Sequence, residues 1–170
     1  DWVVVGSSPD EMIKQGFKQV GKNFPVFLHP NTNEEYALAR KDRKTGVGHK
    51  DFQFNFSPNV TLEEDLERRD LTINSMALDE NGNLIDPFNG AKDIENKCFR
   101  PVSQAFFEDP LRALRVARFK AQFPEFFLHE SMEQALFKIS ASNELLNLSS
   151  ERVWGEAVSY THLRAHETRT

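Results

Sequence analysis

The stretch of residues 108–119 combines charged side chains whose types and spacing could bind an anion. It contains a carboxylate, Asp109, near its start, followed by Arg112, Arg115 and Arg118. On a helix, at about 100° per residue, these three arginines lie on one side and turn by roughly 120° in total. A guanidinium donates in a planar fork that suits phosphates and base edges. The stripe therefore predicts either an anion-binding helix face or a solvated one, and both interpretations stay open.

A second group of such side chains lies in residues 68–75, Arg-Arg-Asp-Leu-Thr-Ile-Asn-Ser. Arg69 offers donors for a phosphate, while Asp70 and Asn74 offer groups for a hydroxyl. Cations here also suit a helix C-terminus, whose last carbonyls carry partial negative charge. The cluster is consistent with a nucleotide-binding segment and equally with an ordinary helix end.

Local signals predict the elements that position these groups. Asp109 is a favoured N-cap and Pro110 fits the first helical position, which predicts a helix over 110–122. Thr61 and Glu64 form a capping-box pattern for a helix that ends near residue 69. Further helices are predicted at 9–14, 91–97, 130–140 and from 151 onward, strands at 1–6, 17–20, 25–29, 34–40, 73–78 and 84–85, and a loop ending in a short hairpin arm at 41–60.

The predicted strands fall in the first part of the chain, and only helices follow residue 100. This distribution predicts an α+β fold, in which a small mixed sheet precedes an all-helical part. We expect one domain over 1–100 and a second, helical and incomplete, over 101–158. Residues 159–170 show no clear apolar face and resemble translated vector sequence, so we expect them to be a non-native tail.

The composition excludes several classes of protein. The 170 residues are 39% hydrophobic and 28% charged, with a formal net charge of -5, which argues against a broad basic surface for nucleic acid. A single cysteine, Cys98, excludes an internal disulfide, and no run of about 18 apolar residues could cross a membrane. These features predict a cytoplasmic protein with no membrane partner, and they indicate no oligomeric state.

Four motifs follow one another along the chain. They are residues 68–75, Asp-Pro-Phe-Asn-Gly-Ala-Lys-Asp-Ile at 86–94, Glu-Asp-Pro-Leu-Arg at 108–112, and Glu-Arg-Val-Trp-Gly-Glu at 151–156. Together with Asp-Trp-Val-Val-Val-Gly at 1–6, they resemble the motifs of bacterial class II CCA-adding tRNA nucleotidyltransferases, within the polymerase-β-type nucleotidyltransferase superfamily. The resemblance spans about residues 1–157. It implies that 1–100 is the nucleotidyltransferase head and that 101–158 is the neck, which recognises the nucleotide base.

The resemblance implies a catalytic centre of acidic residues and Mg²⁺. In the family two carboxylates of an Asp-x-Asp hold the metal, and Asp1 matches the second of them. Glu35, on a strand predicted to lie beside the first, resembles the superfamily's third acidic position, although a solvated edge-strand glutamate fits it as well. The first carboxylate and a Gly-Gly turn would precede Asp1. We therefore expect the chain to be a fragment truncated at both ends, and inactive, although its parent enzyme is active.

The resemblance also implies which residues bind the nucleotide. Arg69 and Asp70, with Asn74 of the same motif, would hold the triphosphate and the ribose hydroxyl. Asp109 and Arg112 would read the Watson–Crick edge of the base, because a carboxylate accepts from the exocyclic amine that C and A share while a guanidinium donates. Further phosphate or nucleotide contacts are expected from the next two arginines of the helix, Arg115 and Arg118.

These assignments predict a parent enzyme that adds CCA to tRNA 3′ ends from CTP and ATP and releases pyrophosphate. A poly(A) polymerase of the same superfamily shares several of the motifs, and a catalytically dead nucleotide- or RNA-binding module is the other alternative.

Residues 86–93 resemble the family's hinge between head and neck, and 41–60 its flexible loop, which favours CCA or A addition. Arg152 and Glu156, four residues apart on a predicted helix, are expected to form a structural ion pair.

Overall fold

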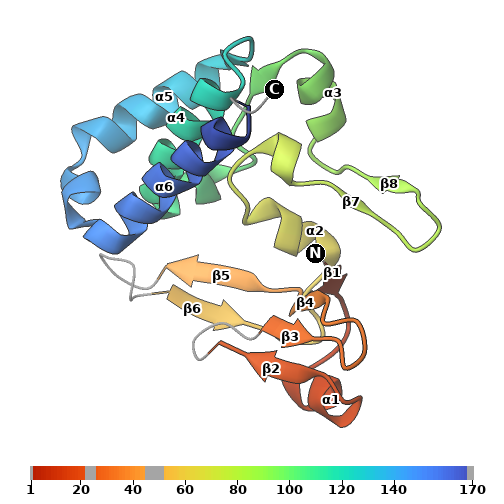
Figure 1. Cartoon of the computed structure of the whole chain (residues 1–170). Coiled ribbons are helices and arrows are strands. Elements are labelled where there is room, and N and C mark those ends of the chain that lie inside the picture. Colours follow the sequence, from red (N-terminus) through yellow and green to blue (C-terminus); the bar gives the residue numbers. More distant parts are fainter. Residues whose placement is uncertain (1, 22–25, 45–51, 168–170) are drawn as a thin grey trace. The chain divides into compact units, whose positions relative to one another are not determined.

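The computed structural model describes residues 2–21, 26–44 and 52–167 (Figure 1). By their contacts the described residues form two compact units, one that ends at Arg68 and one that begins at Arg69. This division comes earlier than the domain boundary expected near residue 100, because Leu71 and Phe99 share a hydrophobic core with the later helices. The domain boundary itself stays a prediction.

The first unit contains a four-stranded mixed sheet, which confirms the predicted fold class for this part of the chain. The strand order is β1-β4-β3-β2, with β1 parallel to β4 and the other neighbours antiparallel. One helix, α1, starts at a capping box made by Ser8 and Glu11. The bounds are β1 Trp2–Val4, α1 Pro9–Lys14, β2 Lys18–Val20, β3 Val26–Leu28 and β4 Glu35–Leu38.

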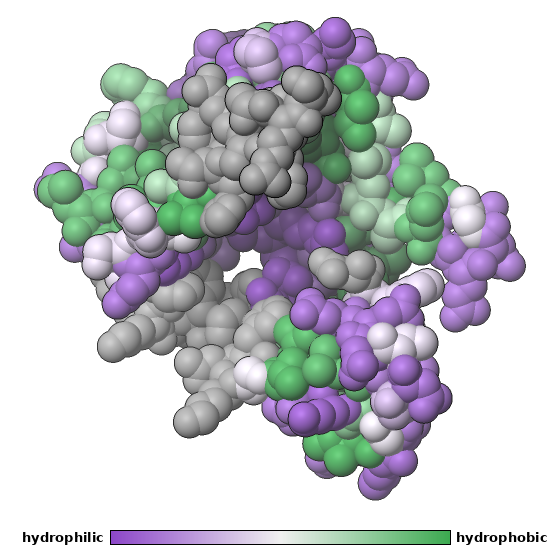
Figure 2. All heavy atoms as spheres, viewed as in Figure 1, coloured by the Kyte–Doolittle hydropathy of each residue, from purple (hydrophilic) through white to green (hydrophobic). Residues whose placement is uncertain are grey.

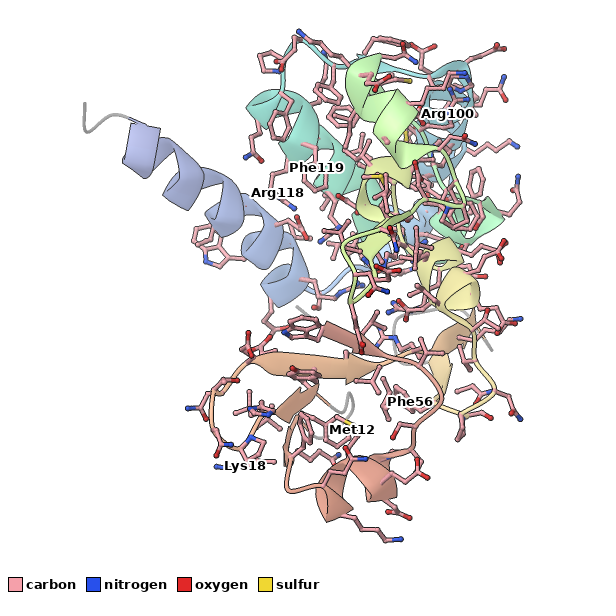
Figure 3. All side chains as sticks on the ribbon, turned by 90° about the vertical axis from the view of Figure 1, so that its right-hand side faces the viewer. Met12, Lys18, Phe56, Arg100, Arg118 and Phe119 are labelled. Carbon is pink, nitrogen blue, oxygen red and sulfur yellow. The ribbon has the colours of Figure 1, made fainter. Side chains whose placement is uncertain are left out.

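The core of the first unit lies between α1 and one face of the sheet. Met12 of α1 packs with Phe27 and Leu38, and Phe56 lies against them, as Figure 3 shows for Met12 and Phe56. Because side chains alternate along a strand, Glu35 lies on the opposite face of β4 from Leu38. The segment expected as a loop with a hairpin arm forms the hairpin β5 Lys41–Lys44 and β6 Phe52–Asn55, and α2 Leu62–Glu67 follows with the predicted capping box.

The second unit is mainly helical. One prediction is wrong: residues 73–78 do not form a strand, because a 3-10 turn occupies 72–74 and only two residues of β7 follow. The hydroxyl of Ser75 donates to the carbonyl of Leu71, which closes this turn. The bounds are η1 Thr72–Asn74, β7 Ala77–Leu78, β8 Leu84–Ile85, α3 Gly90–Glu95, β9 Cys98–Phe99, η2 Gln104–Glu108, α4 Leu111–Gln122, β10 Phe127–Leu128, α5 Glu130–Ala141, η3 Asn143–Asn147 and α6 Ser150–Glu167.

A hydrophobic core joins η1, β9, η2, α4, β10, α5 and η3. Leu71, Phe99 and Phe106 are completely buried there, together with residues of α4 and α5. A turn at residues 79–82 closes the β7–β8 hairpin, whose tip is hydrophilic in Figure 2 while Leu78 and Leu84 on its strands are exposed. The backbone of α6 continues to residue 167 and so includes most of the predicted tail. Among the described residues, no helix is both long and apolar enough to cross a membrane.

Candidate nucleotide-binding site

The start of α4 holds the carboxylate that was expected to read the base. Asp109 has an extended backbone, and the helix is assigned from Leu111, one residue later than predicted. The two carboxylate oxygens of Asp109 divide their tasks: Oδ1 accepts from the Leu111 N–H at 3.1 Å, and Oδ2 accepts from Arg152 Nη2 at 2.7 Å. The cap that the sequence predicted is present, and an arginine of α6 fixes the other oxygen.

Arg112, the second expected base reader, is also held. Its Nη1 donates to the carbonyl oxygen of Ala105 in η2 at 2.6 Å. A hydrogen bond from a charged donor is stronger than a neutral one, so this contact orients the guanidinium. The first turn of α4 and the turn before it therefore fix both side chains that were assigned to the base.

Arg115 lies between two carboxylates from distant parts of the sequence. Its Nε donates to Asp70 Oδ2 at 2.8 Å, and its Nη1 donates to Glu156 Oε1 at 3.2 Å. Burial opposes the charged form of this arginine, but the two carboxylates outweigh it and raise the pKa of Arg115 further above its ordinary value. Arg115 thus links the segment at residue 70 to α6.

Arg118 completes this network. Its Nε donates to Glu156 Oε2 at 2.8 Å, and Figure 3 shows the side chain directed from α4 towards α6. Arg152 and Glu156 were expected to pair with each other, and the structure instead pairs each with a residue of the Asp109–Arg118 stretch. The arginine stripe is neither a fully solvated face nor a set of unpaired cations. The carboxylate of Glu156 in α6 pairs with two of its three members, Arg115 and Arg118.

The segment after Arg68 is ordered by its own polar side chains. Asp70 is 5% exposed, and its Oδ1 accepts from the Leu71 N–H at 2.9 Å and from Asn74 Nδ2 at 3.0 Å. Arg69 Nη1 donates to the Asn74 carbonyl at 3.0 Å. The three residues expected to hold triphosphate and ribose are therefore close together, and Arg115 joins them from α4.

Asp70 remains ionised in this setting. Burial alone would raise the pKa of its carboxyl, but the charge of Arg115 and the hydrogen bonds from Asn74, Arg115 and the Leu71 N–H outweigh burial and lower the pKa below its ordinary value. A carboxyl with a lowered folded-state pKa stabilises the fold above its unfolded-state pKa, and this stabilisation disappears as the pH falls through the folded-state value.

We therefore expect Asp70→Asn to cost about 1–2 kcal/mol of unfolding free energy at pH 7, since a charged hydrogen-bond partner of Arg115 is lost. Below about pH 4 the wild type loses the same contribution, so the gap between the two proteins should close. Urea unfolding of both chains at a series of pH values measures this gap. A gap that stayed constant down to pH 3 would contradict the role assigned to the ionised carboxylate.

Sequence reasoning did not single out a second buried polar group in this unit. Asp93 of α3 is 3% exposed and accepts from the Thr72 hydroxyl at 2.7 Å and from Arg100 Nε at 2.9 Å. Figure 3 places Arg100 beside α3. Arg100 Nη1 also lies 2.8 Å from Nε2 of His129. Only the position of Asp93 within the motif at 86–94 could have indicated this group, because the four residues are far apart in the sequence.

The expected metal site is not assembled by the described residues. Asp1 lies outside them, and Glu35 is exposed on β4, where its backbone pairs with Leu28. Across 2–21, 26–44 and 52–167, no three His, Cys, Asp or Glu side chains lie together as a metal site would require. Mg²⁺ is usually bound through one or two carboxylates together with substrate phosphates and water, so the described residues by themselves do not test the expected Mg²⁺ site.

Comparison with known proteins decides the family. Residues 9–100, more than half of the chain, match the family described as the poly A polymerase head domain. The chain belongs to this family. The match covers β2, β3, β4 and the motifs at 68–75 and 86–94, and it confirms the superfamily that the motifs indicated.

Individual proteins and solved structures are also similar to this chain. The chain is 60% identical over 158 residues to the CCA-adding enzyme of Hamiltonella defensa, covering 92% of this chain and 39% of that protein. It thus spans well under half of the curated relatives that it matches. The crystal structure of the Bacillus stearothermophilus CCA-adding enzyme in complex with CTP is similar, with a TM-score of 0.64 and 31% identity over 85% of this chain and 34% of that one. A tRNA nucleotidyltransferase complexed with a primer tRNA and an incoming ATP analogue gives a TM-score of 0.64 and 28% identity, over 92% of this chain and 46% of the other.

Proposed function

We propose that this chain is part of an enzyme that adds CCA to the 3′ end of tRNA from CTP and ATP and releases pyrophosphate. The observation that carries the proposal is the 60% identity to a CCA-adding enzyme across almost the whole chain. The similar structures that hold CTP, or tRNA and an ATP analogue, support the same substrates. A cytoplasmic location belongs to this proposal.

Within the chain, Arg69, Asp70 and Asn74 bind the triphosphate and ribose, and Asp109 and Arg112 select the base. A carboxylate oxygen can accept a second hydrogen bond, so Asp109 can receive the amine of C or A while Arg152 still donates to it. The guanidinium of Arg112 carries five N–H donors in a planar fork, and one of them is directed at the Ala105 carbonyl. Arg115 and Arg118 act mainly through Glu156, which keeps α4 in place. Mg²⁺ stays a prediction that rests on the resemblance at Asp1.

The experiment that tests the function uses the full-length protein and a tRNA that lacks its 3′ CCA. With CTP and ATP together, we expect the tRNA to grow by the three nucleotides of CCA and then stop. A long A tail would instead support a poly(A) polymerase, the candidate that the family's description favours. No extension, with CTP and ATP still bound, would support a nucleotide-binding module.

Selection of the base by Arg112 gives a second expectation. Arg112→Ala should reduce the preference for CTP and ATP over UTP and GTP by about tenfold or more, because a well-placed guanidinium contributes roughly 1–3 kcal/mol of base discrimination. Single-nucleotide incorporation with each of the four triphosphates measures the preference. Arg112→Lys is the control that keeps the charge and removes the fork. Unchanged discrimination in the alanine variant would count against base reading by this residue.

A further inference from the structure

His129 occupies a position that no sequence motif marks. It is the N-cap of α5, and its Nδ1 lies 2.7 Å from the Ser131 hydroxyl and 3.2 Å from the Ser131 N–H. Its other ring nitrogen, Nε2, lies 2.8 Å from Arg100 Nη1. The imidazole thus contacts the first turn of α5 on one side and a guanidinium on the other.

The chemistry of Arg100 fixes the protonation of this ring. A guanidinium only donates, so Nε2 of His129 must accept, and the ring must be neutral with its proton on Nδ1. That N–H then donates to the Ser131 hydroxyl at 2.7 Å. In this tautomer Nδ1 cannot also accept from the Ser131 N–H, which lies farther away, at 3.2 Å. An imidazolium would direct an N–H at Arg100 and break the contact. This tautomer makes His129 an acceptor for Arg100 and a donor to α5.

Arg100 connects His129 to the nucleotide-binding segment through side-chain hydrogen bonds. Its Nε donates to Asp93 Oδ2, and the same oxygen accepts from the Thr72 hydroxyl. Two backbone hydrogen bonds run alongside, from the Thr72 N–H to the Arg100 carbonyl and from the Val102 N–H to the Asp70 carbonyl. Thr72 lies between Asp70 and Asn74. The series of side-chain contacts that starts at His129 therefore ends within the segment assigned to the triphosphate and ribose.

We propose that His129, neutral and protonated on Nδ1, is a positioning residue that holds the nucleotide-binding segment through Arg100, Asp93 and Thr72. This inference rests on the proposed function, since it assigns a nucleotide-binding role to residues 69–74. The segment binds the nucleotide in the ground state and the transition state alike. Losing the link should therefore raise KM for CTP and ATP and leave kcat almost unchanged.

Two substitutions separate the link from the cap. In His129→Asn, the amide oxygen lies near the position of Nδ1 and is a favoured N-cap acceptor for α5, but the side chain is too short to replace Nε2. In His129→Gln, the amide oxygen reaches the position of Nε2 and can accept from Arg100, although glutamine is a poorer cap. In the full-length protein we expect KM and the dissociation constants for CTP and ATP to rise about fivefold to tenfold in the asparagine variant. One charged hydrogen bond is lost, and only part of this loss reaches the nucleotide-binding segment. The glutamine variant should restore them to within about twofold.

The position of the ring proton of His129 can be measured directly by NMR spectroscopy. Long-range ¹H–¹⁵N spectra of the histidine-labelled full-length protein should show the protonated nitrogen of His129 to be Nδ1. A proton on Nε2, an unchanged nucleotide affinity in His129→Asn, or no restoration in His129→Gln would each overturn the inference. If the wild type added no CCA but His129→Asn still weakened nucleotide binding and His129→Gln restored it, the proposed function would fail and the positioning role would stand.

Discussion

Gly90→Ala is expected to destabilise the protein by about 2–3 kcal/mol, because an added methyl group has no room at this position. A Cβ on Gly90 would overlap the carbonyl oxygen of Thr72 and would lie 2.9 Å from Met76 Sδ. The Met76 side chain can move, but the Thr72 carbonyl belongs to the turn that carries the nucleotide-binding segment. The clash must therefore separate α3 from η1.

Gly155→Ala is the matched control for this substitution. Gly155 lies inside α6, and nothing approaches within 4 Å of the position of its Cβ. Alanine there should stabilise the helix by up to about 1 kcal/mol, the difference in helix propensity. Urea unfolding of the two variants and the wild type gives both values. A loss of less than about 0.5 kcal/mol in Gly90→Ala would mean that the packing of α3 against η1 is looser than the structure indicates.

Glu156→Gln is expected to cost about 2–3 kcal/mol of unfolding free energy. The Glu156 side chain is 14% exposed and accepts from Arg115 and Arg118, so its neutral replacement leaves two arginines close together without a shared anion. Removing one partner of a fully buried ion pair costs roughly 3–5 kcal/mol. The expected loss is smaller because the Arg115 side chain is 36% exposed and keeps Asp70 as a partner.

Glu151→Gln on the same helix provides the comparison. Glu151 is exposed in the first turn of α6, where a carboxylate contributes only through the helix dipole. Its replacement should change the unfolding free energy by less than about 0.5 kcal/mol. Equal losses in the two variants would show that Glu156 contributes no more than a surface charge, and the network around Arg115 would then need another explanation.

Features encoded within a few residues were predictable from the sequence. The capping boxes at Ser8 and Thr61 are present, and so is the carboxylate cap at the start of α4, because each involves neighbours three residues apart or fewer. The alternation of side chains predicted the mixed sheet, and the order of the motifs predicted the family.

Features that depend on contacts between distant residues were not predictable. Arg115 was expected to face a phosphate, but its partners are Asp70 and Glu156, 45 and 41 residues away in the sequence. The apolar run at 73–78 suggested a strand, yet the N–H groups of Asn74 and Ser75 form the backbone bonds of a 3-10 turn, and the Ser75 hydroxyl donates to the Leu71 carbonyl. The partners of Asp93 are Thr72 and Arg100, 21 and 7 residues away, and Arg100 in turn contacts His129, 29 residues further along. These separations leave no local pattern in the sequence.

The pairing between α4 and α6 also determines how the second unit attracts ligands from a distance. Asp70, Arg115, Arg118 and Glu156 carry two positive and two negative charges within one connected set of ion pairs, so their net charge is zero. Such a set produces only a weak field beyond about 10 Å in physiological salt. Arg115 and Arg118 therefore add little to the rate at which an anionic nucleotide arrives, and that rate should depend less on ionic strength than two unpaired, exposed arginines would imply.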